Sequence, residues 1–63
     1  MGKITLMAAR ISAGMSRKTV SERLDVAEST IARWEQGNSR IDAKAFLELC
    51  EMYGFEASDI FLP

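Results

Sequence analysis

The sequence contains no histidine, one cysteine and one proline among its 63 residues. Zinc sites usually need several cysteine or histidine ligands, so no metal centre is expected. A nucleophile activated by histidine is excluded in the same way. Cys50 has no second cysteine to pair with, and we expect it to be a small core residue. No cluster of acid, base and nucleophile supports an enzyme, and we expect no cofactor and no metal; no small-molecule ligand is evident.

Long hydrophobic runs are also absent from the chain. No apolar stretch approaches the length that crosses a membrane, and no basic segment followed by an apolar one opens the sequence. We therefore expect a soluble, cytoplasmic protein with no membrane partner. A chain of this length allows one domain, covering residues 1–63, with a modest hydrophobic core.

The charged residues are distributed unevenly, although the net charge is only −1. Residues 1–40 carry seven basic and four acidic side chains, a net charge of +3. Residues 41–63 carry one basic and five acidic side chains, a net charge of −4. A basic half of this kind suits an anionic partner, although an uneven solvated surface would give the same pattern.

Glycines and capping residues divide the chain into helical segments. Gly14, Gly37 and Gly54 each follow a helix-like stretch, and Ser16 and Asp42 are good N-cap residues. No convincing strand alternation is present. Helices are expected over about residues 4–13, 17–24, 28–36 and 43–53, with a last helical turn over about 57–61. The link "DVA" between the second and third helices is so short that the two should cross steeply, as in a helix-turn-helix.

The segment "ESTIARWEQ", residues 28–36, has two different faces when it is placed on a helix. Ile31 and Trp34 form an apolar face. The opposite face carries hydrogen-bonding side chains around a small alanine: Glu28, Ser29, Ala32, Arg33 and Gln36. A helix anchored by its back in this way can enter a major groove. Many amphipathic surface helices share the pattern, so it does not decide the function alone.

Longer motifs narrow the choice of protein family. The segment "MSRKTVSERLDVAESTIARWEQG" resembles the helix-turn-helix of the Xre, or lambda-repressor-like, family, and "ARISAGMS", "DAKAFLELCEMYG" and "DIFLP" extend the resemblance from Leu6 through Leu62. The resemblance implies a compact, all-α domain of five short helices, with the helix-turn-helix at about residues 17–36. It also implies a sequence-specific regulator, commonly a repressor, that binds a near-palindromic operator in double-stranded DNA as a homodimer.

The resemblance also implies roles for individual residues. The base-contacting set is Ala27, Glu28, Ser29 and Arg33. In this set Arg33 would bind guanine, Glu28 would accept from the cytosine amino group, and Ala27 would touch a thymine methyl group. The phosphate-contacting set, which fixes register rather than sequence, is Ser16, Arg17, Gln36, Asn38, Ser39 and Arg40.

Two further sets of residues concern the packing of the helices and the pairing of two chains. The resemblance implies a structural ion pair between Arg10 and Glu35, joining the first and third helices; two unrelated surface charges would be the alternative. The candidate dimer contacts lie at the end of the fourth helix and after it: Phe55, Ala57 and Ser58.

Four positions depart from the family pattern. One of them is Ser21, an inward position that is often alanine, where the hydroxyl can bond to a carbonyl one turn back. Arg17 replaces the usual glutamine at the start of the second helix, Asp25 replaces the usual glycine of the turn, and Ala27 replaces the usual serine or threonine cap. Asp25 tolerates a left-handed backbone at some cost. Ala27 cannot cap with its side chain, which costs about 1 kcal/mol.

One apolar stripe and one alternative function stay open. Ile4, Met7 and Ile11 form a second apolar stripe on the first helix, expected to pack against the terminal segment through Phe55 or Phe61 and otherwise to contact another chain. The alternative function is a protein-interaction module of the same fold, such as an antitoxin or antirepressor with an acidic binding face.

Overall fold

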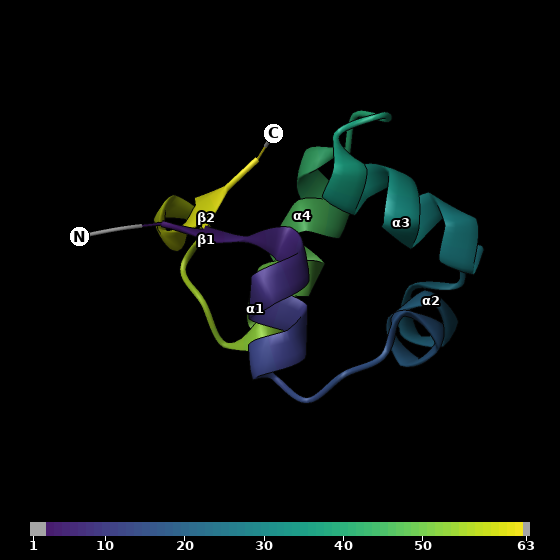
Figure 1. Ribbon diagram of the computed structural model, residues 1–63, viewed down its shortest axis with the longest axis horizontal. Helices are drawn as coiled ribbons and strands as arrows, with labels where there is room; N and C mark the ends of the chain where they lie inside the picture. The colour runs from purple at the N-terminus through teal and green to yellow at the C-terminus, as the bar shows by residue number, and fades with distance from the viewer. Residues whose placement is uncertain (1–2, 63) are drawn as a thin grey trace.

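The computed structural model describes residues 3–62. Within them the chain forms α1 (Leu6–Ser12), α2 (Arg17–Leu24), α3 (Glu28–Gln36) and α4 (Ala43–Tyr53). A single 3-10 turn, η1 (Ala57–Asp59), follows, and two short strands, β1 (Ile4–Thr5) and β2 (Ile60–Phe61), lie near the two ends of the chain. The domain is mostly helical, as expected (Figure 1).

Side-chain caps explain where three of the helices begin. The side-chain oxygens of Thr5, Ser16 and Asp42 accept hydrogen bonds from backbone N–H groups at the start of α1, α2 and α4, at 3.1, 3.1 and 3.3 Å. Each bond satisfies one of the N–H groups that a helix start leaves unpaired. The cap of α3 is Ala27, which has the required extended backbone but makes no side-chain bond.

The first helix is shorter than the sequence predicted. Residues 4 and 5 belong to β1, because Thr5 adopts the extended conformation of an N-cap and the helix can begin only at Leu6. β1 pairs in parallel with β2, with Ile4 opposite Ile60 and Thr5 opposite Phe61. Ile60 is buried and Ile4 is half-buried, so the strand pair closes one side of the core.

The expected fifth helix is also absent from the described residues, which contain four α-helices. Over residues 57–61 the chain makes one 3-10 turn and then extends. The Asp59 carboxylate accepts a hydrogen bond from the N–H of the N-cap residue Glu56 at 3.2 Å, which stabilises the start of this single turn. Ile60 then takes the extended conformation that β-branched residues favour.

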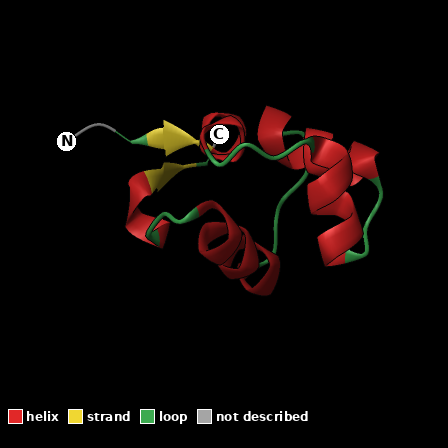
Figure 2. Ribbon diagram, turned by 90° about the horizontal axis from the view of Figure 1, so that it is seen from below, coloured by secondary structure: helices red, strands yellow, loops and turns green. Residues whose placement is uncertain are grey.

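The hydrophobic core lies where the four helices and the strand pair meet. Its largest fully buried side chains are Leu6, Val20, Ile31 and Leu49, and the core also includes Trp34 and Tyr53. Figures 1 and 2 both show α2 and α3 together at the end of the molecule opposite the strands. The core therefore holds the inner face of α3 and leaves the other face outside. No helix in residues 3–62 is long and apolar enough to cross a membrane.

Candidate nucleic-acid interface

The turn between α2 and α3 consists of three residues, Asp25, Val26 and Ala27. Asp25 adopts a left-handed conformation, with φ 58° and ψ 47°, and is the one non-glycine residue with positive φ in the described chain. The Val26 N–H returns to the Ser21 carbonyl at 3.0 Å, which closes the end of α2. Asp25 thus performs the role of a glycine, because aspartate accepts this conformation more readily than most residues do.

The two faces of α3 differ in burial as well as in polarity. Ile31 and Trp34 are buried against the core, whereas Glu28, Ser29, Arg33 and Gln36 are exposed. The side-chain hydrogen bonds of α3 come from Glu35 and Gln36. Within residues 3–62 none engages the side chains of Glu28, Ser29 or Arg33. The exposed face therefore presents free donors and acceptors on a helix whose position is fixed from behind.

The residues expected to contact bases share this surface. Ala27, Glu28 and Ser29 lie together at the N-terminal end of α3, and Arg33 lies one turn further along. All four are exposed. Glu28 occupies the first turn, where the partial positive charge of the helix N-terminus favours a carboxylate.

The residues expected to contact phosphates fall into two groups. Ser16 is the N-cap of α2 and Arg17 is its first residue. The others lie at the end of α3 and just after it: Gln36, Asn38, Ser39 and Arg40. The Ser16 hydroxyl is engaged locally, because it accepts from the Thr19 N–H and donates to Thr19 Oγ1, both at 3.1 Å. Asn38 Nδ2 donates to Gln36 Oε1 at 3.0 Å, and Ser39 and Arg40 are exposed.

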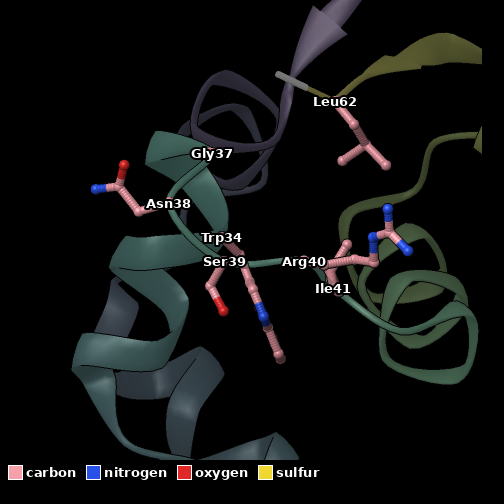
Figure 3. Close-up of a pocket in the computed structure, with 7 residues that line it drawn as sticks. All are labelled: Trp34, Gly37, Asn38, Ser39, Arg40, Ile41 and Leu62. Atoms are coloured by element: carbon pink, nitrogen blue, oxygen red, sulfur yellow. The ribbon is translucent and has the colours of Figure 1, made fainter.

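A shallow pocket lies beside the segment between α3 and α4. Its volume is about 370 Å³, and it is lined by Trp34, Gly37, Asn38, Ser39, Arg40, Ile41 and Leu62. In Figure 3 Leu62 extends toward Arg40 and Ile41, whereas Asn38 points away from them. The lining mixes apolar and polar groups, and the cationic Arg40 side chain stands at its exposed rim.

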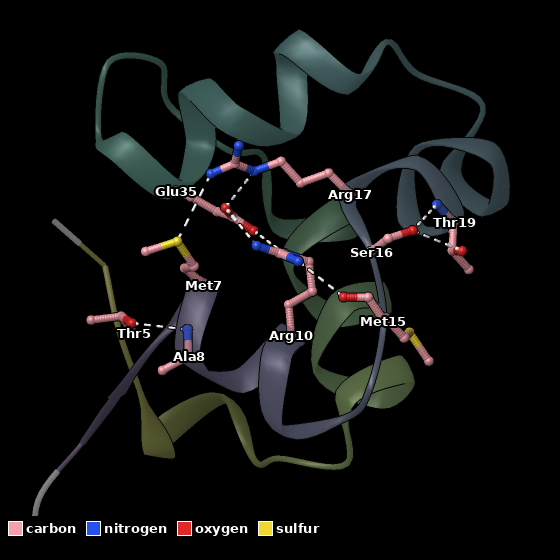
Figure 4. Close-up of polar contacts among 9 residues, drawn as sticks. All are labelled: Thr5, Met7, Ala8, Arg10, Met15, Ser16, Arg17, Thr19 and Glu35. Atoms are coloured by element: carbon pink, nitrogen blue, oxygen red, sulfur yellow. Dashed lines mark hydrogen bonds and ion pairs between the residues drawn. The ribbon is translucent and has the colours of Figure 1, made fainter.

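One carboxylate joins three helices. Arg10 Nε on α1 donates to Glu35 Oε2 on α3 at 2.7 Å, which is the pairing that the family resemblance implied. Arg10 Nη1 also donates to the Met15 carbonyl at 2.9 Å. Arg17 Nε at the start of α2 donates to Glu35 Oε1 at 3.0 Å (Figure 4). The Glu35 side chain is 3% exposed, so its charge is balanced almost entirely by these two arginines.

The contact between Arg17 and Glu35 was missed from the sequence. The only signal was the arginine at a position where glutamine is usual, and that signal gave no partner.

The Glu35 carboxylate also affects the pKa of Tyr53. Burial raises the pKa of Tyr53 to about 12, and the Glu35 carboxylate adds to the increase, while Arg10 opposes it.

The three candidate dimer contacts differ in burial. Phe55 is half-buried and packs against the core, whereas Ala57 and Ser58 are exposed in η1.

The second apolar stripe expected on the first helix consists of Ile4, Met7 and Ile11. The expectation that the terminal segment covers it is wrong for two of these three residues. Ile4 packs beside β2, but Met7 and Ile11 remain 42% and 61% exposed, because the strand pair ends before it reaches them.

The surface charge of residues 3–40 remains positive after folding. The Arg10–Glu35 pair is buried and removes one charge of each sign from the surface. The cations that stay wholly or partly exposed are Lys3, Arg17, Lys18, Arg23, Arg33 and Arg40, against Glu22, Asp25 and Glu28. In the described part of the chain, no cluster of three or more cysteine, aspartate or glutamate side chains could hold a metal ion.

The short turn, the buried back of α3 and its exposed polar front define a helix-turn-helix domain. A helix-turn-helix family model matches residues 6–60 of the chain. The chain therefore belongs to this family, the Xre or lambda-repressor-like family of DNA-binding regulators. Neither a curated protein nor a solved structure matches the chain.

Proposed function

We propose that the protein is a sequence-specific transcription regulator that inserts α3 into the major groove of duplex DNA. The observation that carries the proposal is the exposed face of α3. On this face the side chains of Glu28, Ser29 and Arg33 make no hydrogen bond within residues 3–62. Ile31 and Trp34 fix the helix from behind. The major groove is wide enough to admit a helix and presents a distinct pattern of donors and acceptors for each base pair.

Each base-facing residue suits a particular partner. Arg33 can donate two parallel hydrogen bonds to guanine O6 and N7, and Ser29 can donate or accept. Glu28 is suited to the exocyclic amino group of cytosine, because an ionised carboxylate only accepts. Ala27 offers a methyl group to a thymine methyl group. This set therefore supplies both polar and apolar base contacts.

The positive groups around the ends of α2 and α3 supply the sequence-independent part of binding. Arg17 lies at the start of α2, and Ser39 and Arg40 follow α3, so cationic and hydroxyl groups flank the base-reading face. Such groups hold the register of a protein on the DNA backbone. Contacts to phosphates release bound counterions, which makes affinity fall steeply as salt rises.

A binding titration tests this function. Duplexes enriched from a random library should bind, and the logarithm of affinity should fall linearly with the logarithm of salt concentration, by about 0.9 for each phosphate neutralised. Arg33→Met should reduce the preference for the enriched duplex, because it removes the guanine contact. Failure of the wild-type protein to bind any selected duplex at low salt would contradict the proposal.

The working unit in this proposal is a homodimer on a near-palindromic site. α3 contains nine residues, so it spans only about 13 Å and reads few base pairs. Two copies about one helical turn of DNA apart give a site long enough for useful specificity. Ala57 and Ser58 are exposed and available for the dimer contact, with Phe55 beside them. Two protein chains per duplex are expected by sedimentation, and a one-to-one complex on the best site would contradict the dimer.

Repression is the regulatory outcome we propose for such a dimer. A protein that occupies an operator overlapping a promoter excludes the polymerase. A reporter placed behind the selected site should therefore lose expression when the protein is present. Increased expression from the same reporter would contradict repression while leaving DNA binding intact.

A further inference from the structure

The helix-turn-helix is tied at both of its ends, and one of the two ties is formed by side chains. The backbone turn of Asp25, Val26 and Ala27 joins the C-terminus of α2 to the N-terminus of α3. At the opposite end, Arg17 is the first residue of α2 and Glu35 is the residue before the last of α3. The 3.0 Å contact between Arg17 Nε and Glu35 Oε1 therefore closes the end that the backbone leaves open (Figure 4).

The two arginines that bond to Glu35 have different structural roles. The Arg10 side chain is 10% exposed and uses Nε and Nη2 on Glu35 and Nη1 on the Met15 carbonyl. This network holds Glu35 to α1 and balances its charge. Arg17 is a second cation on the same carboxylate, so neutralising Glu35 does not require it. What Arg17 adds is a connection between α2 and α3.

The surroundings of Arg17 favour one placement of its guanidinium group. The side chain is 37% exposed, Nε faces Glu35, and Nη2 lies 3.8 Å from the Met7 sulfur on α1. A planar guanidinium loses little conformational freedom for each bond that it forms in such a fixed setting. The carboxylate that receives it is buried and already oriented by Arg10, so the contact is stronger than an ordinary surface pair.

We infer that Arg17 is a positioning residue for α3: by bonding to Glu35 it fixes the angle at which the base-reading helix leaves α2. The inference rests on the proposed function, since positioning matters only if α3 reads DNA. Hydrogen bonds to base edges require the helix to lie within a fraction of an ångström of the right place. General attraction to phosphates does not, because it depends mainly on charge.

The two roles of an arginine at this position lead to different results. An arginine that only contacts phosphate contributes equally to binding of every duplex. A positioning arginine contributes mainly to the preferred duplex, because a mispositioned α3 loses base contacts and keeps its charge. The quantity to measure is therefore the ratio of affinities for a selected duplex and a scrambled duplex at one salt concentration.

Arg17→Met is the test variant, and Lys18→Met is its matched control. Both remove one positive charge from the first turn of α2, but Lys18 is exposed and makes no side-chain contact with Glu35 within residues 3–62. Arg17→Met should reduce the selected-to-scrambled ratio by about tenfold, the size of one coupled contact in a network. Lys18→Met should weaken both duplexes by the same factor. If Arg17→Met behaves as Lys18→Met does, the inference is wrong.

Arg17→Lys provides a second variant that keeps the charge and should fold even if Arg17→Met does not. It replaces the planar fork by a single ammonium group, so its affinity ratio should fall between those of the wild type and Arg17→Met. A ratio equal to that of the wild type would show that the charge alone is needed and would overturn the positioning role.

A measurement on the free protein separates the inference from the proposed function. Residual dipolar couplings of backbone amides report the angle between α2 and α3 without DNA. The angle should change or become less ordered in Arg17→Met and stay the same in Lys18→Met. If the wild-type protein bound no duplex, the proposed function would fail, and this measurement would still decide on Arg17. An unchanged, equally ordered angle in Arg17→Met would overturn the inference.

Discussion

Arg10 and Glu35 lie 25 residues apart in the sequence and form a 2.7 Å ion pair that joins α1 to α3. Because both side chains are almost completely buried, loss of the Glu35 carboxylate leaves the Arg10 guanidinium without an ionic partner in a poorly solvated place. Glu35→Gln should therefore lower the free energy of unfolding by about 3–5 kcal/mol, a large fraction for a small domain. Urea unfolding measures the change. Glu48→Gln, at an exposed site on α4, is the control, and equal midpoints for the two variants would contradict the structural role of the pair.

The uncapped start of α3 offers a stabilising substitution. Ala27 already has the extended backbone of an N-cap, with φ −73° and ψ 151°, but lacks a side-chain acceptor. Ala27→Ser should raise the free energy of unfolding by about 1 kcal/mol, because a hydroxyl can accept from the first-turn N–H groups. Ser16→Ala should lower it by a similar amount through loss of the cap of α2. Chemical denaturation measures both changes, and an Ala27→Ser variant no more stable than the wild type would show that the start of α3 is satisfied in another way.

The left-handed residue of the turn predicts an order of stabilities. Asp25 has φ 58°, a conformation that glycine adopts freely and β-branched residues adopt at high cost. Asp25→Gly should be at least as stable as the wild type, and Asp25→Val should be less stable by about 1–2 kcal/mol. Thermal unfolding of the three proteins gives the order. A valine variant as stable as the wild type would contradict the strain assigned to this position.

Tyr53 predicts how stability depends on high pH. Its pKa is raised to about 12 in the folded protein, above the ordinary value of about 10, mainly because of burial. Since the folded state keeps the phenol protonated more strongly, this stabilisation is complete below about pH 10 and is lost as the pH rises toward 12. Tyr53→Phe should lose less stability across this interval. Tyr53 is the only tyrosine, so phenolate absorbance reports its titration directly, and a midpoint near 10 in the folded protein would contradict the shift.

Local chemistry explains which parts of the fold could be predicted. The bounds of α2, α3 and α4 follow from caps and stop signals beside the helices themselves, such as Ser16, Asp42 and Gly37. The strand pair could not be predicted, because two residues are too few to show alternation. The pairing of Ile4 with Ile60 depends on the chain ends meeting in space. Because of this pairing, residues 4–5 and 60–61, which the sequence predicted to be helical, form strands.

The candidate site shows the same division. The exposed and buried faces of α3 follow from helical spacing alone, because side chains three and four residues apart share a face. The contact of Arg17 with Glu35 depends on the angle at which α2 crosses α3, and no local pattern encodes that angle. The resemblance to the family predicted the ion pair of Arg10 with Glu35. It could not predict the contact of Arg17 with Glu35, because this chain departs from the family pattern at Arg17.

Glu28 is the base-reading residue whose role is most easily separated from general affinity. Its carboxylate repels phosphates, and the N-terminus of α3 partly offsets this repulsion. If it accepts a hydrogen bond from the cytosine amino group, it selects a base rather than adding affinity. Glu28→Gln should then bind non-specific DNA more tightly. At one position in each half-site its preference should move from cytosine toward adenine, by about 1–3 kcal/mol.

Parallel selection of duplexes from a random library is the most direct test that the exposed face of α3 reads DNA. The wild type, Glu28→Gln and Glu22→Gln are compared at one salt concentration; Glu22 is an exposed carboxylate on α2, so its variant controls for the loss of charge. The wild type should enrich a two-fold symmetric site, Glu22→Gln should enrich the same site, and Glu28→Gln should enrich a site with adenine in place of cytosine at one symmetric position. No enrichment by the wild type would contradict base reading by this face, and an identical site for all three proteins would contradict the base-selecting role of Glu28.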